Sequence, residues 1–129
     1  MERRVRKKSR FRELAKFSAQ LAESKKADEI LILDVRTFHL FTDYLLLCSG
    51  HSEIHVETIA EEIRCKLKER GMVPGNIEGL KTKRWILMDY GALVVHVFYP
   101  ETRRFYNLEG LWDGARKVNW QKRKRRQKK

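Results

Sequence analysis

Segments with helical spacing of apolar residues alternate along this chain with short, continuously apolar segments. From Phe11 to about residue 25, apolar residues recur mostly every three or four positions, which predicts an amphipathic helix. Two continuous apolar runs follow, at residues 30–33 with Val35 and at residues 44–48. Runs of this length between polar residues are typical of strands that are buried on both faces of a sheet.

A turn at residues 49–52 ends the second run, and Ser52 is placed to cap a helix. The helix that it opens has its apolar residues three and four apart, which predicts one buried face: Val56, Ile59, Ala60, Ile63 and Leu67. Gly71 stands where a glycine often ends a helix. Residues 71–83 are rich in glycine and predict a loop.

The second half predicts a hairpin followed by a helix. Residues 85–88 and 93–99 form two apolar runs joined through Asp89, Tyr90 and Gly91, and glycine at this point can take a positive φ. Pro100 ends the second strand. Beyond it, apolar residues again recur with helical spacing: Phe105, Leu108, Leu111, Trp112 and Ala115.

This order of elements predicts one α/β domain, with a mixed β-sheet of at least four strands and flanking helices. A chain of 129 residues is long enough for one core. Charge suggests the boundaries, because the basic residues are concentrated at the two ends. We expect a basic N-terminal extension at 1–10, a folded domain at 11–115 and a basic C-terminal tail at 116–129.

The charge distribution indicates a polyanionic partner. Residues 1–10 contain six lysines or arginines and one glutamate, and residues 116–129 contain nine and no acid. The part between them has 14 basic and 16 acidic residues. Basic ends on a nearly neutral body are typical of contact with phosphates, whereas a membrane-binding helix would need an apolar face. A purely solubilising tail is the alternative.

The sequence favours a cytoplasmic protein. No run approaches the roughly 18 apolar residues of a membrane span, and the first ten residues lack the apolar stretch of a secretory signal. Acidic residues near the start argue against a mitochondrial presequence. Cys48 and Cys65 lie in apolar segments, which is typical of reduced cysteines.

Metal binding and thiol catalysis are both poorly supported by the sequence. His51 and His55 have the spacing of two ligands on one helix face, but the cap at Ser52 places His51 before the helix. No third ligand is indicated, so we expect neither a metal nor a cofactor. Cys48 lies within an apolar strand, where a small buried side chain is the usual role.

The turn at residues 49–52 could hold an anion at the start of a helix, as in nucleotidyltransferases. Those enzymes also carry two carboxylates, spaced D-x-D on the next strand, that bind magnesium. Here that strand has only Asp89 at its end, and Leu87 stands two residues earlier. A Gly-Lys-Ser/Thr loop is also missing. We therefore expect a structural turn and no enzymatic activity.

The hairpin region holds more aromatic side chains than a small core needs: Trp85, Tyr90, Phe98, Tyr99, Phe105 and Tyr106. Because strand side chains alternate between faces, some of them should be exposed. An exposed aromatic patch rimmed by Asp89, Arg103 and Arg104 is typical of a protein-binding hot spot. The alternative is that Trp85 and Phe98 complete the core.

Several motifs together resemble the ribosomal silencing factor, or Iojap, family. They follow one another in order from about residue 27 to residue 115: Ile-Leu-Ile-Leu-Asp-Val at 30–35, Thr-Asp-Tyr at 42–44, Cys-Ser-Gly-His-Ser at 48–52, Glu-Gly at 78–79, Trp-Ile-Leu-Met-Asp-Tyr-Gly at 85–91, Val-Val-His-Val-Phe at 94–98, Arg-Phe-Tyr-Asn-Leu-Glu at 104–109 and Leu-Trp at 111–112. The resemblance implies a nucleotidyltransferase-like α/β fold without catalytic activity. It also implies binding to the fourteenth protein of the large ribosomal subunit, which blocks joining of the small subunit and represses translation.

The resemblance also implies which residues contact the partner. They are Trp85, Asp89 and Tyr90 in the hairpin motif and Phe98 on the next strand, with His96, Arg103, Arg104 and Tyr106 at further motif positions. Ala92 replaces an acid that is frequent in the family after the Asp-Tyr-Gly turn, so no contact is expected from it.

The basic ends lie outside the recognised motifs. We expect ribosomal RNA contacts from Lys122, Arg123, Lys124, Arg125 and Arg126. An RNA- or ribosome-assembly binder and a nucleotidyltransferase-like enzyme are the alternative functions. The sequence leaves open whether the free protein forms a homodimer.

Overall fold

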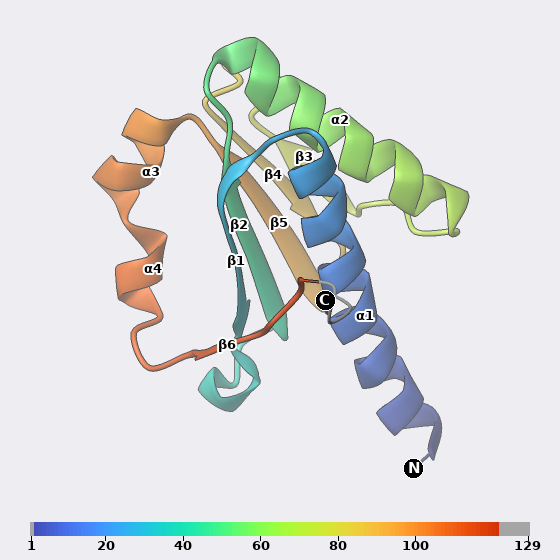
Figure 1. The fold of residues 1–129 in the computed structure, drawn as a ribbon. Helices are drawn as coiled ribbons and strands as arrows, with labels where there is room; N and C mark the ends of the chain where they lie inside the picture. The colour runs from blue at the N-terminus through green and yellow to red at the C-terminus, as the bar shows by residue number, and fades with distance from the viewer. Residues whose placement is uncertain (1, 122–129) are drawn as a thin grey trace, which may run out of the picture.

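The fold is taken from a computed structural model of the chain, which describes residues 2–121 and, in the first helix, side chains from Arg10 onward. Its elements in chain order are α1 (Glu2–Ser24), β1 (Asp28–Asp34), η1 (Arg36–Phe38), β2 (Tyr44–Ser49), α2 (Glu53–Glu69), β3 (Asn76–Glu78), β4 (Trp85–Asp89), β5 (Leu93–Phe98), α3 (Pro100–Tyr106), α4 (Leu108–Leu111) and β6 (Arg116–Lys117). Figure 1 shows them as one body around a central sheet.

Six strands form one mixed sheet in the order β3-β4-β5-β2-β1-β6. The central pair, β2 and β5, is parallel, and the other neighbours are antiparallel. The chain between β2 and β5 contains α2, β3 and β4, long enough for the crossover that a parallel pair requires. The expected single α/β domain with a mixed sheet is thereby confirmed.

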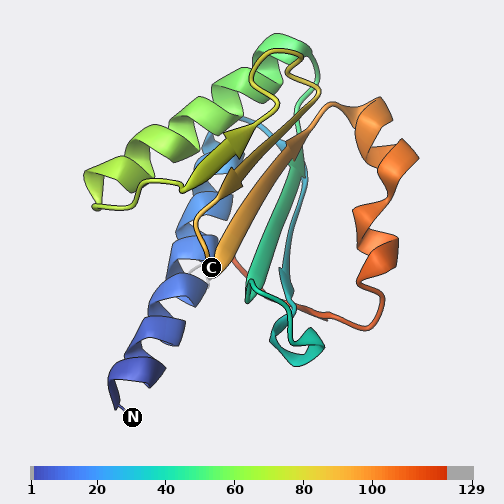
Figure 2. The same cartoon turned by 180° about the vertical axis from the view of Figure 1, so that it is seen from behind.

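Helices α1 and α2 cover one face of the sheet, as Figures 1 and 2 show from opposite sides. Ser52 caps α2 by accepting a hydrogen bond from the backbone N–H of His55 at 3.0 Å. The predicted face of α2 is the buried one: Val56, Ile59, Ala60, Ile63 and Leu67. Together with small residues of α1 and the facing side chains of the strands, it forms the larger core.

The opposite face of the sheet is covered less completely. Helices α3 and α4 lie over the β1–β2 side, where Leu108 and Trp112 pack on a smaller cluster that includes Leu33, Leu45 and Leu47. Strand β4 is buried alternately, with Ile86 and Met88 buried toward α1 and α2. On its other face, toward α3, β4 presents the half-buried side chains of Trp85, Leu87 and Asp89.

Three features differ from the sequence-based expectation. Helix α1 begins at Glu2, nine residues before the first apolar position of the predicted helix. The predicted loop at 71–83 contains the edge strand β3, which pairs with β4. The predicted terminal helix is two short helices, because Asn107 between them adopts a left-handed conformation with φ 44°.

The folded part also extends beyond the expected boundary at residue 115. Arg116 and Lys117 form β6, which pairs antiparallel with Leu33 and Asp34 of β1. Val118 is 5% exposed, and its backbone N–H donates to the carbonyl oxygen of Ile32 at 2.9 Å. The concentration of basic residues predicted that a tail begins at residue 116. In the structure, backbone pairing with β1 and the buried side chain of Val118 keep residues 116–118 in the fold.

Candidate partner-binding surface

The β4–β5 register gathers several of the predicted contact residues on the face toward α3. Trp85 lies opposite Phe98, and Leu87 lies opposite His96. Side chains of directly paired residues in a sheet point to the same face. Tyr106, at the end of α3, completes the group from above.

These residues form a continuous aromatic cluster of Trp85, His96, Phe98 and Tyr106. The ring of Trp85 lies 5.0 Å from that of Phe98 and 4.9 Å from that of Tyr106, measured between centroids. The imidazole of His96 is stacked on Phe98 at 6.0 Å, with 9° between the planes. Such spacing is typical of aromatic groups that pack as a unit.

Burial divides the cluster into a base and an accessible part. Phe98 is fully buried and His96 is 6% exposed, whereas Trp85 is half-buried and Tyr106 is 52% exposed. Phe105, next to Tyr106, is 80% exposed. A partner can therefore reach Trp85 and Tyr106, while Phe98 and His96 support them from below.

A hydrogen bond fixes the orientation of Trp85. Its indole N–H donates to Nδ1 of His96 at 3.0 Å. Because indole only donates, Nδ1 of His96 must be unprotonated. Burial lowers the pKa of His96 to about 4, which keeps the ring neutral and this bond intact at physiological pH.

A groove beside the cluster contains residues that the sequence did not single out. It has a volume of about 470 Å³ and lies between β4 and α3, lined by Glu78, Gly79, Thr82, Arg84, Trp85, Leu87, Thr102 and Tyr106. Gly79 has φ +89°, and a Cβ there would collide with the backbone carbonyl of Trp85. The Glu-Gly motif was visible in the sequence, but nothing in it indicated a groove.

Asp89 and Tyr90 are not part of the aromatic cluster. Asp89 shares its face, but its carboxylate accepts a hydrogen bond from the backbone N–H of Gly91 at 2.8 Å and so shapes the hairpin turn. Tyr90 belongs to the core under α1 and α2 and is 6% exposed. Within residues 2–121 its hydroxyl has no hydrogen-bond partner, and burial raises its pKa to about 12.

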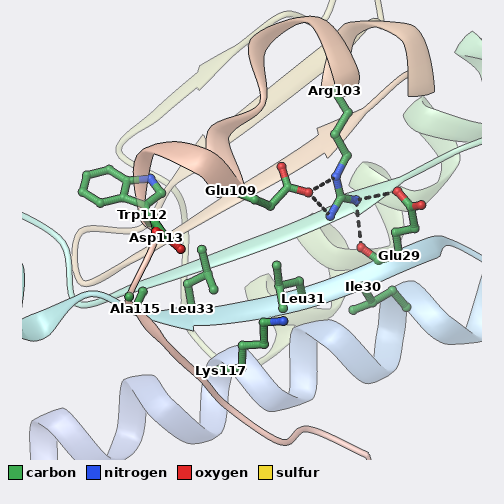
Figure 3. A pocket seen from close by; sticks show the side chains of 11 residues that line it. Glu29, Ile30, Leu31, Leu33, Arg103, Glu109, Trp112, Asp113, Ala115 and Lys117 are labelled. Atoms are coloured by element: carbon green, nitrogen blue, oxygen red, sulfur yellow. Dashed lines mark hydrogen bonds and ion pairs between the residues drawn. The ribbon is translucent and has the colours of Figure 1, made fainter.

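Arg103 lies in the interior instead of on the rim. It is 6% exposed, and its guanidinium donates to the Glu109 carboxylate at 2.9 Å, the Ser49 hydroxyl at 2.9 Å and the Glu29 carbonyl oxygen at 2.8 Å. Figure 3 shows the bonds of Arg103 to Glu109 and Glu29 at one end of a second pocket, of about 500 Å³, between β1 and the α4–β6 segment. Arg103 thus ties α3 and α4 to the sheet, whereas Arg104 is exposed.

The turn between β2 and α2 is held by its own hydrogen bonds. The ring of His55 accepts from the backbone N–H of His51 through Nδ1 at 2.8 Å, and its Nε2 lies 2.6 Å from the carbonyl oxygen of Lys25. A Cβ on Gly50 would approach the backbone nitrogen of Val56 to 2.8 Å, so the turn packs directly on the first turn of α2.

In the described part of the chain, neither the two cysteines nor the histidines form a recognisable reactive centre. Burial raises the pKa of the Cys48 thiol to about 12. Nε2 of His51 lies 2.6 Å from the Asp28 carboxylate, which is a surface ion-pair geometry. No group of three or more potential metal ligands occurs within residues 2–121.

Two further findings concern the ends and the helices. The predicted RNA contacts at Lys122, Arg123, Lys124, Arg125 and Arg126 lie outside the described residues. Among the helices of residues 2–121, none is both long and apolar enough to cross a membrane.

A mixed sheet with α1 and α2 over one face and an aromatic cluster on the other defines a small α/β protein with a candidate binding surface. A family model described as "Ribosomal silencing factor during starvation" matches residues 8–129. The chain therefore belongs to the ribosomal silencing factor family, which consists of translational regulators and not of enzymes. This match includes the basic C-terminal residues, which lay outside the motifs recognised in the sequence.

Individual relatives agree with this family. The chain is 41% identical over 102 residues to the ribosomal silencing factor RsfS of Bacillus subtilis, covering 79% of this chain and 86% of the relative. It is 33% identical over 95 residues to the mouse "Mitochondrial assembly of ribosomal large subunit protein 1", and the match covers 71% of this chain and 42% of the relative. A crystal structure of a Chromobacterium violaceum protein superposes with a TM-score of 0.76 at 32% identity. The match covers 83% of this chain and 88% of that protein.

Proposed function

We propose that this protein binds the large ribosomal subunit through the aromatic cluster and thereby prevents the small subunit from joining. The observation that carries the proposal is the accessible pair Trp85 and Tyr106. Phe98 and His96 hold the Trp85 side chain, and the ring of Tyr106 packs on Trp85. Preordered aromatic side chains beside a groove lose little entropy on binding, and for that reason they dominate protein–protein contacts.

The partner within the subunit is proposed to be its fourteenth protein. The motif resemblance supports this choice, because Trp85 and its neighbours match the family's contact motif. The name of the mouse relative, which mentions the ribosomal large subunit, supports the wider assignment to the large subunit. Translation would be repressed by steric exclusion alone, and this requires no chemistry from the protein.

Contacts outside the aromatic cluster complete the proposal. The basic residues 122–126 add contacts to ribosomal RNA through phosphate groups. The protein acts in the cytoplasm, where it meets free large subunits. Homodimer formation in the free state would compete with binding only if it covered Trp85 and Tyr106.

A subunit-joining assay tests the proposal. Large subunits are incubated with excess protein, small subunits are added, and the formation of complete ribosomes is followed by light scattering. We expect the unmodified protein to suppress joining and the double variant Trp85→Ala/Tyr106→Ala to have lost at least tenfold in potency.

Phe41→Ala is the matched control, because Phe41 is an aromatic residue that is 94% exposed in the loop between η1 and β2. It should suppress joining as well as the unmodified protein. Equal suppression by the double variant would show that the blocking surface lies elsewhere.

A further inference from the structure

His96 uses one of its two ring nitrogens within the fold. The indole N–H of Trp85 donates to Nδ1 at 3.0 Å, so the single proton of the neutral ring lies on Nε2. Burial lowers the pKa of His96 to about 4, and the ring is therefore neutral at physiological pH. The ring is stacked on Phe98 and cannot turn over without breaking its bond to Trp85. Nε2–H is thus a hydrogen-bond donor of fixed direction.

This N–H has no acceptor in the described part of the chain. Within residues 2–121, the fully covered polar side-chain atoms that lack a partner are the Tyr90 hydroxyl and one oxygen of Glu109. Nε2 of His96 is not one of them, and the hydrogen bond of its side chain runs through Nδ1. Nε2–H must therefore reach the molecular surface, although His96 is only 6% exposed. An unpaired donor on an otherwise buried side chain points to a ligand.

The surroundings of Nε2–H are apolar. His96 pairs with Leu87 of β4 and Leu47 of β2, and both leucines belong to the apolar cluster of this face, together with Val94 and Phe98. Figure 2 shows α3 and α4 over the β1–β2 side of the face, so among the described residues no helix lies over the β4 side. The donor is therefore open to a partner that approaches across β4.

A partner on the aromatic cluster would cover this donor. The rings of His96 and Trp85 lie 6.0 Å apart between centroids, so a surface that packs on Trp85 also removes water from Nε2–H. Covering an N–H without giving it an acceptor costs binding free energy. The partner must therefore bring an oxygen to this point, and an apolar surface without one is rejected.

We propose that His96 selects the partner by donating a hydrogen bond from Nε2 to a neutral carbonyl oxygen on the partner protein. His96 is then a specificity-determining residue, in addition to the support that it gives to Trp85. This inference rests on the proposed function, because it requires a protein of the large subunit to cover Trp85 and Tyr106.

The charges around the site favour a neutral oxygen over a carboxylate or a phosphate. Asp89 shares this face of β4, and Glu78 lines the adjoining groove. Arg84 also lines the groove, but it is already paired with Glu53 at 3.1 Å. The ring of His96 is neutral and adds no positive charge. A main-chain or amide carbonyl accepts the hydrogen bond without the repulsion that a second anion would meet.

The test isolates the outward donor by working in a Trp85→Phe background. This background has no indole N–H, so the bond between Trp85 and His96 cannot contribute to differences between variants. His96→Gln keeps an amide N–H that can donate outward, whereas His96→Met has no N–H donor on its side chain. We expect Met at position 96 to bind large subunits about tenfold more weakly than Gln, measured by co-sedimentation at one salt concentration.

Leu45→Met in the same background is the matched control, because it places a methionine in the apolar cluster of this face and removes no donor. It should bind like the Trp85→Phe chain. Thermal unfolding of every variant shows that each is folded at the temperature of the binding measurement.

Nuclear magnetic resonance of the full chain with ¹⁵N-labelled histidine observes the donor directly. In the free protein at pH 7, the proton of His96 should lie on Nε2 and not on Nδ1. Addition of the isolated fourteenth protein of the large subunit should move the Nε2–H proton signal downfield and slow its exchange with water.

Equal binding of the Gln and Met variants would overturn the inference, and so would a proton on Nδ1 in the free protein or an Nε2–H signal that the partner leaves unchanged. The double variant Trp85→Ala/Tyr106→Ala distinguishes this failure from a failure of the proposed function. If that double variant binds large subunits normally, the proposed function is wrong. If it has lost binding while Gln and Met at position 96 bind equally, only the role of His96 is wrong.

Discussion

At the scale of single residues, the motif positions expected to contact the partner include both accessible and buried side chains. Trp85 and Tyr106 are accessible, whereas Phe98 is fully buried. The alternation of strand side chains places Trp85 and Leu87 on one face, as the structure shows. It could not predict exposure, which depends on where α3 ends and on how far α4 covers the sheet.

Arg103 and Arg104 illustrate the same limit. They are adjacent basic residues, and the sequence predicted that both lie on the rim of the exposed aromatic patch. Arg103 points inward because Glu109, Ser49 and the carbonyl oxygen of Glu29 meet there from three elements. Such a convergence depends on tertiary packing, for which the local sequence carries no signal.

His96 should make stability depend on pH. Its pKa is about 4 in the folded protein and about 6.5 in the unfolded chain, so the unfolded state binds the proton first as the pH falls. The contribution of His96 to the free energy of unfolding is therefore fully present above pH 6.5 and is lost progressively as the pH falls from 6.5 to 4. The full loss is roughly 3 kcal/mol.

The measurement is urea unfolding at pH 7.5 and pH 5.0 for the unmodified protein and His96→Gln. Glutamine can still accept the hydrogen bond from Trp85 but does not titrate. The variant should lose less stability than the unmodified protein between these two pH values. Identical losses would mean that His96 is protonated in the fold and does not hold Trp85 as described.

At the scale of elements, the position of Tyr106 depends on how α3 and α4 are attached to the sheet. Arg103→Met should lower the free energy of unfolding by about 2–3 kcal/mol, because it leaves Ser49, Glu109 and a backbone carbonyl without their donor. Arg104→Met, at the adjacent exposed position, should change it by at most about 0.5 kcal/mol. Equal unfolding midpoints in urea would contradict this role of Arg103.

The elements that the sequence predicted well are those whose side chains pack on both sides or on one regular face. Strands β1, β2 and β5 and the capped helix α2 belong to this group. Strand β3 was missed because it has three residues and lies at an edge, where backbone pairing with β4 matters more than apolar content. The start of α1 was missed because residues 2–10 contain a single apolar side chain, Val5.

The break at Asn107 had a weak signal. Asparagine tolerates the left-handed conformation better than most residues, but it also occurs within helices. The apolar spacing after Pro100 predicted one helix with a single buried face. Instead, the break leaves Phe105 80% exposed and Leu111 67% exposed, and only Leu108, Trp112 and Ala115 of that set pack on the sheet.

At the scale of the whole molecule, residues 116–118 belong to the folded part, and the sequence of residues 122–129 offers no apolar side chain that could add to the core. A chain ending at Gln121 should unfold like the full chain. A chain ending at Ala115 should lose at least about 2 kcal/mol, because it lacks buried Val118, the contact of Trp120 with α1 and the pairing of β6.

Thermal unfolding followed by circular dichroism compares the two truncated chains with the full one. A low melting temperature for the chain ending at Gln121 would mean that residues 122–129 contribute to the fold. An unchanged melting temperature for the chain ending at Ala115 would contradict the described role of β6 and Val118.

The proposed contacts differ in how they depend on salt. The aromatic cluster would supply a small, preordered protein contact. The proposed RNA contacts of residues 122–126 would add charge whose contribution falls with salt. At high salt the aromatic contact should carry most of the remaining affinity.

The central claim is that Tyr106 and Trp85 face the large subunit, and co-sedimentation tests it most directly. Tyr106 is the better probe, because it is more exposed than Trp85 and its removal leaves the core intact. At about 300 mM salt, the protein should pellet with isolated large subunits and not with small subunits. Tyr106→Ala should bind about thirtyfold more weakly, or about 2 kcal/mol, whereas Phe41→Ala should bind normally. Undiminished binding of a folded Tyr106→Ala variant, or equal pelleting with small subunits, would contradict the account.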